Sequence, residues 1–258
     1  MPSQRNTANL ARVIPPALLI AALLALWQVG APALGLDAAT LPTPTQIVAS
    51  GWADRADLAV AAAYSAAEVA AGMALAVAFG VGLGAVTAQA TVARSTLLPL
   101  VVAAQTVPII AIAPLVVRWA GFGIGGKIVL VGIYATLPIL LATYRGMRDA
   151  DPSQVATAAS LGANSTWIAA HVKLPSAARS VFAGVKISAT YAFGTAATAE
   201  YVGAENGLGT YLNVAKNSYR TDLVFAATLA LVALTLLLFA LVWATERALI
   251  RWPEGGTR

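Results

Sequence analysis

The apolar residues of this chain lie in long continuous blocks and do not alternate with the 2.0- or 3.6-residue period of half-buried strands and helices. Six blocks are long enough for a membrane span, and they cover residues 13–30, 58–88, 97–117, 128–144, 181–199 and 223–245. Hydrophobic residues make up 59% of the chain, charged residues 10%, and the mean hydropathy is +0.76. The pattern predicts an all-α membrane protein with six transmembrane helices.

The first apolar block could be a retained span or a cleaved signal peptide, because small residues at 31–33 resemble a cleavage position. We expect a retained span, since five more apolar blocks follow it. The loop after it predicts a short helix near 46–52. The expected organisation is one membrane domain at 13–250 between polar tails at 1–12 and 251–258.

The distribution of Lys and Arg predicts the orientation, because cytoplasmic loops carry an excess of these residues. Six spans place both termini on one side, and of the 16 Lys and Arg residues eleven fall on that side and five on the other. The larger group is Arg5, Arg12, Arg94, Arg145, Arg148, Lys173, Arg179, Lys186, Arg247, Arg251 and Arg258. We therefore expect both termini and the segment 151–175 in the cytoplasm.

The segment 151–175 is moderately polar, lies between two apolar blocks and predicts two short helices. Asp151 is a good N-cap with Pro152 at the first helical position, and Gln154 has the spacing of a capping box. Gly162 can take the left-handed conformation that ends the first helix.

Asn164 can cap the second helix, Ser165 to Val172, which we expect to stop before Leu174-Pro175. Asn164 also begins a glycosylation pattern, but its cytoplasmic side favours the cap. Neither helix is long enough to cross a bilayer. The pair therefore predicts a projection that a partner outside the membrane binds.

Glycines and prolines shape two neighbouring blocks. Gly80 and Gly84, with Gly82 between them, give the block 58–88 a small-residue face for close helix contact. Three prolines interrupt the block 97–117.

The stretch Gly121–Lys127 fits two phosphate-loop patterns by letter, GxxxxGK and GxGxxG. We reject both, because position 128 is Ile where a phosphate loop needs Ser or Thr for magnesium. Two apolar blocks also flank the stretch in place of a strand and an amphipathic helix. We expect a tight external turn here.

Glu68 is an acidic residue early in the second predicted span. A carboxylate at membrane depth suggests a proton or ion site. The alternative is an interfacial helix on which Glu68 faces water or a neighbouring helix, and the lack of a second carboxylate within one turn favours it.

Polar side chains in three predicted spans are candidates for the wall of a translocation path. Tyr191, Thr195 and Thr198 fall on one face of the fifth span, which also carries Thr190. The alternative is that its threonines hydrogen-bond to other helices. The full candidate set is Gln105, Thr106, Tyr134, Tyr191, Thr195, Thr198 and Glu200.

Composition excludes several other classes. The chain has no Cys and one His, His171, which excludes a disulfide scaffold, thiolate catalysis and Cys or His metal clusters. The carboxylates are scattered and no Ser lies in a nucleophile elbow, so we expect no enzymatic activity and no bound cofactor or metal. The net charge of +5 fits membrane orientation, because no basic run interleaved with aromatics indicates nucleic acid.

Several stretches resemble a known family. Gly162, followed twelve residues later by Leu174-Pro175, resembles the Gly and Leu-Pro of the cytoplasmic loop of binding-protein-dependent ABC importer permeases. The stretches 113–128, 199–209 and 220–225 resemble the nitrate/sulfonate/taurine group of these permeases. The similarity runs from about residue 40 to 252.

The resemblance implies a type I ABC importer in the bacterial inner membrane. Its parts would be two permeases, expected as a homodimer, two cytoplasmic ATPases that bind ATP and magnesium, and an external substrate-binding protein. Segment 151–175 would couple to the ATPase, and the external turn 121–127 and the loop 200–222 would meet the binding protein. The implied coupling residues are Asp151, Ala156, Ala158, Leu161, Gly162, Ala163, Trp167, Leu174 and Pro175.

Two positions depart from the family pattern. The Glu-Ala-Ala of the loop is Ala156-Thr157-Ala158 here, and Glu68 stands where a neutral or basic residue is expected. The leading hypothesis is import of a small solute such as a sulfonate, taurine, nitrate or a pyrimidine precursor. The alternatives are a secondary transporter that uses Glu68 as a proton or ion site, and a membrane scaffold without transport.

Overall fold

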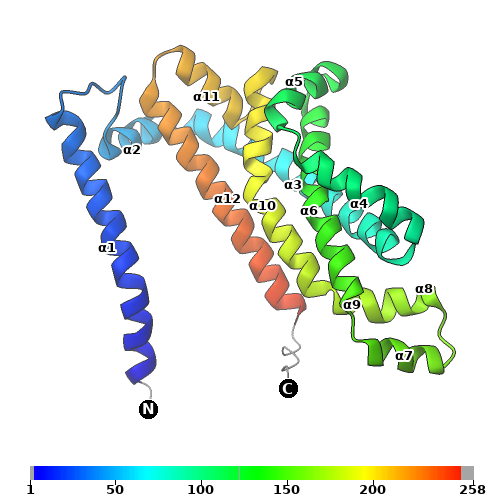
Figure 1. Cartoon of the computed structure of the whole chain (residues 1–258). Coiled ribbons are helices and arrows are strands. Elements are labelled where there is room, and N and C mark those ends of the chain that lie inside the picture. The colour runs from blue at the N-terminus through cyan, green and yellow to red at the C-terminus, as the bar shows by residue number, and fades with distance from the viewer. Residues whose placement is uncertain (1–2, 122, 251–258) are drawn as a thin grey trace. The chain divides into compact units, whose positions relative to one another are not determined.

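The computed structural model describes residues 3–121 and 123–250, and every element within them is helical. The predicted tail 251–258 lies outside the described residues. The helices are α1 (Ser3–Ala33), α2 (Pro44–Ala53), α3 (Arg55–Gln89), α4 (Thr91–Gln105), α5 (Ile109–Ala120), α6 (Ile124–Arg148), α7 (Pro152–Ser160), α8 (Ser165–Ile168), the π-helix η1 (Ala169–Lys173), α9 (Leu174–Ser176), α10 (Ala178–Gly203), α11 (Leu208–Asn217) and α12 (Thr221–Leu249) (Figure 1). The predicted all-α class is confirmed.

The chain divides into two compact units. The smaller unit holds the chain up to Leu58 together with Leu212–Leu229, and the larger unit holds Ala59–Tyr211 and the chain from Ala230 onwards.

In the smaller unit, side-chain hydrogen bonds join α1 to the start of α2. The Gln28 amide donates to the Thr45 hydroxyl at 3.0 Å and accepts from the Thr45 N–H at 3.1 Å. A capping box between Thr43 and Gln46 begins α2. The predicted short helix at 46–52 is confirmed.

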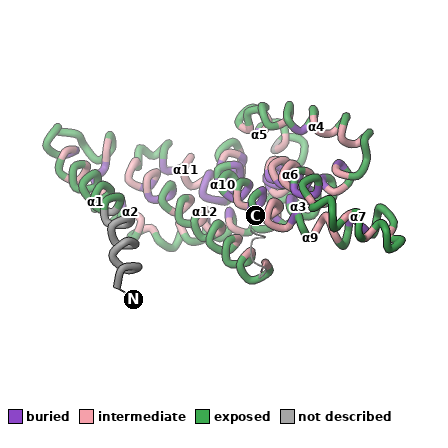
Figure 2. The backbone as a smooth tube through the Cα atoms, turned by 60° about the horizontal axis from the view of Figure 1, so that its bottom comes forward, coloured by how far each residue is buried: buried purple, intermediate pink, exposed green. Residues whose placement is uncertain are grey.

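In the larger unit, the core lies between α3, α6 and α10, where buried residues concentrate (Figure 2). Apolar side chains of α12 pack against this core, and the buried members are Val69, Met73, Ala76, Val131, Ala135, Ile139, Val185, Ala189, Ala192, Phe193 and Ala196. An ion pair between Lys186 and Glu246 also joins α10 to α12. Helix α10 buries one face in this core, and the polar residues Ser188 and Thr195 lie among its buried residues.

Glycines allow α3 to approach α6 closely. A Cβ on Gly80 would lie 2.7 Å from the Cβ of Ile139. A Cβ on Gly84 would lie 2.6 Å from the Cβ of Thr143. The small-residue face is therefore confirmed for these two glycines, but Gly82 has no neighbour within 4 Å of an added Cβ, so its predicted role in the contact is wrong.

The predicted third span is a bent pair of helices. Helix α4 ends at Gln105, α5 begins at Ile109, and their axes meet at 99°. Pro108 is the N-cap of α5 and lacks a backbone N–H, and it also restricts Val107 to extended conformations. This one proline accounts for the break.

By length and composition, three described helices can cross a membrane, namely α3, α6 and α12, or four if the bent pair forms one span. The predicted fifth span lies within α10, which is long enough but is not among the helices that meet this test. In α1 the apolar part is the shorter stretch Leu18–Ala33. A membrane protein with several spans is supported, and the count of six stays a prediction.

Candidate functional site

After α6 the chain folds into a helix hairpin, defined here as residues 152–173 (Figure 1). At its start the Asp151 carboxylate accepts a 2.8 Å hydrogen bond from the Ser153 N–H, which holds the pKa of Asp151 below its usual value. Gly162 follows α7 with a φ of +88°, and the next N–H, that of Ala163, donates to the Ala158 carbonyl. The predicted cap and helix end are confirmed.

The second arm of the helix hairpin begins at Asn164, whose side chain accepts from the Trp167 N–H at 2.8 Å, as predicted. The helical path does not stop before Leu174, however, so that prediction is wrong. It continues from α8 through η1 into α9. Pro175 lies in α9, directly after the π-helix η1.

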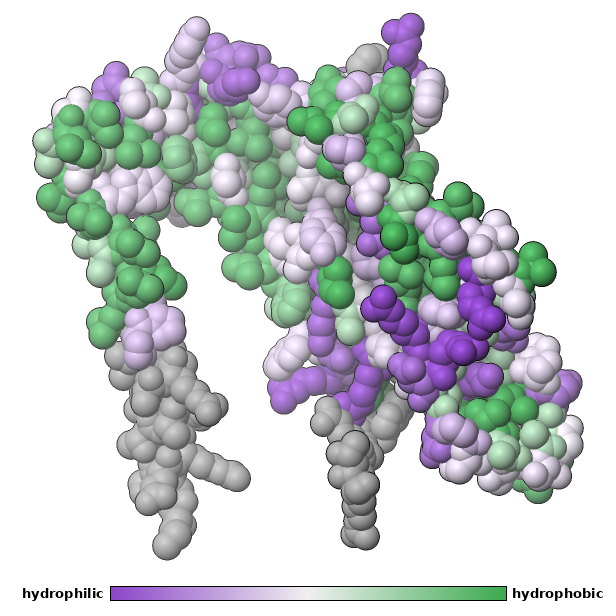
Figure 3. All heavy atoms as spheres, in the orientation of Figure 1, coloured by the Kyte–Doolittle hydropathy of each residue, from purple (hydrophilic) through white to green (hydrophobic). Residues whose placement is uncertain are grey.

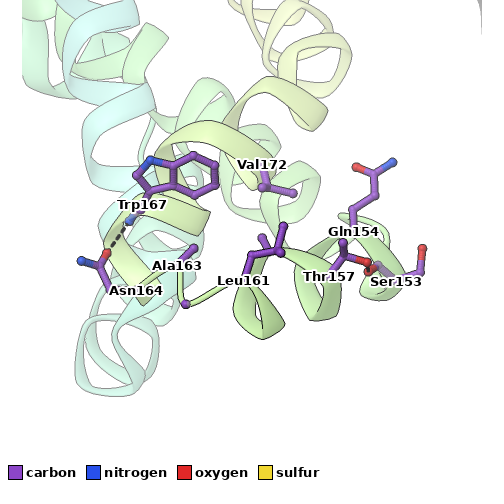
Figure 4. Close-up of a pocket in the computed structure, with 10 residues that line it drawn as sticks. Ser153, Gln154, Thr157, Leu161, Ala163, Asn164, Trp167 and Val172 are labelled. Atoms are coloured by element: carbon purple, nitrogen blue, oxygen red, sulfur yellow. Dashed lines mark hydrogen bonds between the residues drawn. The ribbon is translucent and has the colours of Figure 1, made fainter.

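A groove of about 660 Å³ runs between the two arms of the helix hairpin (Figure 4). Leu161 at the turn is 83% exposed, and Trp167 on the second arm is 47% exposed. The Trp167 ring stacks on the imidazole of His171 with centroids 4.5 Å apart. Two large apolar side chains are therefore exposed on short capped helices, where a partner could cover them.

Five of the predicted coupling residues line this groove. They are Ala158, Leu161, Gly162, Ala163 and Trp167. The other four, Asp151, Ala156, Leu174 and Pro175, lie on the same segment outside the lining.

Basic side chains lie where the helix hairpin leaves α6. Arg145 and Arg148 occupy the last turn of α6, where a cation also opposes the negative end of the helix dipole. Figure 3 shows hydrophilic surface gathered beside the helix hairpin, next to the apolar surface of the longer helices. The cytoplasmic side of the helix hairpin stays a prediction from the charge distribution.

A second polar group lies inside the larger unit. Glu68 on α3 is fully buried, and its carboxylate lies 2.5 Å from the ammonium of Lys127 in the first turn of α6. Apart from this ion pair, the Glu68 carboxylate accepts no hydrogen bond from another described residue. Lys127 is 4% exposed, so it is not a surface residue of the external turn that was expected to meet a binding protein.

The carboxylate of Glu200 on α10 lies beside Glu68 and holds the beginning of α11. It accepts from the Ser65 hydroxyl and from the Gly209 N–H, each at 2.6 Å. The same Ser65 oxygen accepts from the Leu208 N–H at 2.9 Å. Glu68, Lys127 and Glu200, which we call the buried cluster, thus tie α3, α6 and α10 together.

A cavity of about 570 Å³ lies between α4, α5, α6 and α10 of the larger unit. Four predicted path residues line it, Gln105, Tyr134, Tyr191 and Thr195. The other three, Thr106, Thr198 and Glu200, are not among its lining residues.

The bend between α4 and α5 forms one edge of this cavity. The Tyr134 hydroxyl donates at 3.1 Å to the carbonyl of Val107, which lies in the break between the helices. On α10, the hydroxyls of Thr190 and Thr198 donate to carbonyls of their own helix, so the alternative of interhelical bonds does not hold for them. A hydrogen bond between α10 and α6 comes instead from Ser188, which donates to the Ala135 carbonyl at 2.7 Å.

Sequence reasoning missed two features of these sites. It did not pair Lys127 with Glu68, because the two lie on different helices. Ser65 and Glu68 share a helix face, and that spacing was the available signal for a polar site. Arg145 lines the cavity as well, although it was counted only for orientation.

This helical membrane protein has a polar-edged cavity and a projecting hairpin, and its sequence carries no usable phosphate loop. These are the features of a transport subunit that a separate ATPase drives. The chain belongs to the family described as binding-protein-dependent transport system inner membrane component, whose model matches residues 76–251.

Several relatives whose names describe transport are about one third identical to this chain over the aligned residues. The riboflavin transport system permease protein of Chloroflexus aurantiacus is 32% identical over 89% of this chain and 87% of its own length. The carnitine transport permease protein of Listeria monocytogenes is 32% identical over 59% of this chain and 72% of its own length. The putative aliphatic sulfonates transport permease protein of Escherichia coli is 32% identical over 57% of this chain and 56% of its own length.

A solved structure shows the same fold. The inward-facing MetNI methionine ABC transporter contains a chain that matches with a TM-score of 0.66 and 18% identity, covering 76% of this chain and 97% of that one. This chain is therefore the permease subunit of a type I ABC importer, a membrane protein without enzymatic activity of its own. Its partners are an ATPase subunit and a substrate-binding protein, and secondary transport through Glu68 is not favoured.

Proposed function

We propose that two copies of this chain form the translocation path of an importer for a small organic or oxyanionic solute, and that the helix hairpin couples each copy to an ATPase. The observation that carries the proposal is the exposed apolar turn of the helix hairpin, with Leu161 83% and Trp167 47% exposed. Such side chains stabilise a complex when a partner covers them.

We infer that the helix hairpin can transmit force to α10, because its structure is capped and helical throughout the second arm. Both arms begin with side-chain caps, and the second arm passes through η1 and α9 towards α10 without an extended segment. Helix α10 in turn lines the cavity through Tyr191 and Thr195. Closure of two ATPases on ATP would move the helix hairpins and with them the walls of the path.

The missing acid of the loop changes the character of this contact. With Ala156-Thr157-Ala158 in place of Glu-Ala-Ala, the first arm offers no carboxylate for a charged partner at these positions. We infer that apolar burial of Leu161 and Trp167 carries most of the binding to the ATPase.

The homodimer is proposed because a single copy supplies few spans for a path, and identical copies associate most simply around a two-fold axis. Both termini and the helix hairpin are proposed to face the cytoplasm of a bacterial cell. The names of the relatives give three different solutes, namely riboflavin, carnitine and aliphatic sulfonates. The solute class of this chain is therefore inferred from the residues of its own cavity.

The test is recovery of the ATPase in a detergent pull-down with the full-length permease, together with ATP-dependent uptake into proteoliposomes that contain the binding protein. Trp167→Ala removes an interface aromatic, which typically costs about 2 kcal/mol of binding free energy, or roughly thirtyfold in Kd. We expect lost ATPase recovery and lost uptake while the permease still inserts into the membrane.

Trp119→Ala is the matched control, because Trp119 is 76% exposed but lies at the end of α5. It should leave ATPase recovery unchanged. Wild-type recovery with Trp167→Ala, or equal losses with both variants, would contradict the coupling role of the helix hairpin.

A further inference from the structure

The cavity between α4, α5, α6 and α10 presents polar groups that the protein itself does not satisfy. Thr195 is 6% exposed and lines the cavity, yet among the described residues its hydroxyl makes no hydrogen bond. Neighbouring helical threonines behave differently, since Thr136 and Thr198 each donate to the carbonyl four residues earlier at 2.7 Å. A buried hydroxyl normally has a partner, so this one is available to a molecule in the cavity.

Three further lining groups, on exposed residues, also have no hydrogen-bond partner among the described residues. The Gln105 amide, the Tyr191 hydroxyl and the Arg145 guanidinium make no hydrogen bond to another described residue. Gln105 lies at the end of α4 beside the helix break, Tyr191 lies one turn before Thr195, and Arg145 lies in the last turn of α6. All four side chains can donate hydrogen bonds, and the Arg145 guanidinium can only donate, so acceptor atoms on a ligand would match them.

The charge and shape of the cavity restrict what can bind. None of the described lining residues is acidic, and Arg145 adds a positive charge, so a cationic solute is disfavoured. Apart from Ser188, whose hydroxyl already donates to the Ala135 carbonyl, the rest of the lining is apolar or aromatic. It includes two tyrosine rings and Ile109, Val131, Leu137, Pro138, Leu141 and Ile187. A small aliphatic anion would leave most of the 570 Å³ and its apolar wall without contact.

We propose that this cavity is a transit site for a flat heteroaromatic solute that carries carbonyl acceptors and no positive charge. Its ring would lie against Tyr191 and the apolar wall, and its acceptors would take the free donors of Thr195 and Gln105. The inference rests on the proposed import function and adds the solute class to it.

The probe is lumiflavin, a neutral tricyclic heteroaromatic whose fluorescence falls when its ring stacks on an aromatic side chain. It is titrated with the full-length permease in lipid nanodiscs. We expect saturable quenching with the wild-type chain, a Kd about fivefold weaker for Thr195→Val from the lost hydrogen bond, and a Kd at least tenfold weaker for Tyr191→Leu from the lost stacking.

Thr136→Val is the control, because it removes a hydroxyl that already donates within α6 and does not line the cavity. It should bind lumiflavin like the wild type. Ethanesulfonate and choline should not compete with lumiflavin. Absence of saturable quenching, equal weakening by Thr136→Val and Thr195→Val, or displacement by ethanesulfonate would overturn the proposed solute class.

ATP-dependent uptake separates this inference from the function on which it rests. If the reconstituted importer takes up ethanesulfonate with ATP and ignores lumiflavin, the solute class is wrong and the import function stands. If neither ATP nor the binding protein affects uptake of any probe, the import function itself is wrong. Should Thr195→Val fail to insert, Gln105→Leu, at an exposed lining position, gives the same comparison with the same expected loss.

Discussion

The helix hairpin and the buried cluster use their side chains in opposite ways. The helix hairpin exposes Leu161 and Trp167 and satisfies its backbone with local caps, so little of its structure depends on distant residues. The buried cluster hides Glu68, Lys127 and Glu200 from solvent and depends on three helices meeting. The helix hairpin thus has the exposed apolar side chains that the proposed ATPase contact needs, and the buried cluster joins helices within the permease.

The largest expected effect comes from unpairing the buried cluster. Lys127→Met leaves the carboxylate of Glu68 buried without its cation, and breaking a buried ion pair in this way costs about 3–5 kcal/mol of folding free energy. The thermal unfolding midpoint of the detergent-solubilised permease should fall sharply. The double variant Glu68→Leu with Lys127→Met should recover most of the loss, since it removes both charges.

An unchanged midpoint for Lys127→Met would contradict the structural role of the buried cluster. Equal loss in the single and double variants would also contradict it, because packing and not charge would then be the cause.

The next effect comes from overfilling the contact between α3 and α6. Gly84→Leu forces a side chain into space already occupied by Thr143 and should cost about 3 kcal/mol. Gly82→Leu adds the same group where an added Cβ has no neighbour within 4 Å and should change stability by at most about 0.5 kcal/mol. The two unfolding midpoints make the comparison, and equal midpoints would mean that α3 and α6 do not pack through this face.

A smaller and local effect is expected in the helix hairpin. Gly162→Val places a β-branched residue at a φ of +88°, which costs about 1–2 kcal/mol and distorts the turn that carries Leu161. ATPase recovery should fall about tenfold while the unfolding midpoint changes little. Gly125→Val, at a helical glycine with open space around it, should leave recovery intact.

The smallest effect is expected at the cap of α8. Asn164→Ala removes the acceptor of the Trp167 N–H and should destabilise this arm by about 1 kcal/mol. Amide hydrogen exchange in residues 165–168 should become roughly fivefold faster, and exchange in α6 should not change. Ser160→Ala, which removes a hydroxyl bonded within α7, is the control and should have no such effect.

The difference between the two regions also explains what the sequence could predict. The caps at Asp151 and Asn164 and the turn at Gly162 follow from neighbours in the chain, so they could be identified directly. Of the three prolines in the block 97–117, Pro108 lies at the break, whereas Pro99 and Pro114 lie inside α4 and α5 and do not interrupt them. The continuation of the helix through η1 to Pro175 was not predicted. Helices usually end before a proline, and the sequence did not indicate that a π-helix would extend this one.

The buried cluster and the cavity lie beyond such local rules. Glu68 and Lys127 are brought together by the packing of α3 on α6, which no spacing along the chain encodes. The polar face of α10 did identify Tyr191 and Thr195, because helical periodicity applies within one helix. The predicted set also included Thr198 and Glu200, which do not line the cavity. Thr198 donates to a carbonyl of its own helix, and Glu200 accepts from the N–H of Gly209.

The most direct test measures from which side of the membrane the helix hairpin can be labelled, and whether the ATPase subunit protects it from labelling. The chain has no Cys, so Leu161→Cys places a single thiol at the exposed turn. A membrane-impermeant maleimide should label it in inside-out vesicles and not in right-side-out ones, and added ATPase subunit should protect it. Labelling from the exterior, or labelling that the ATPase does not slow, would contradict a cytoplasmic coupling surface.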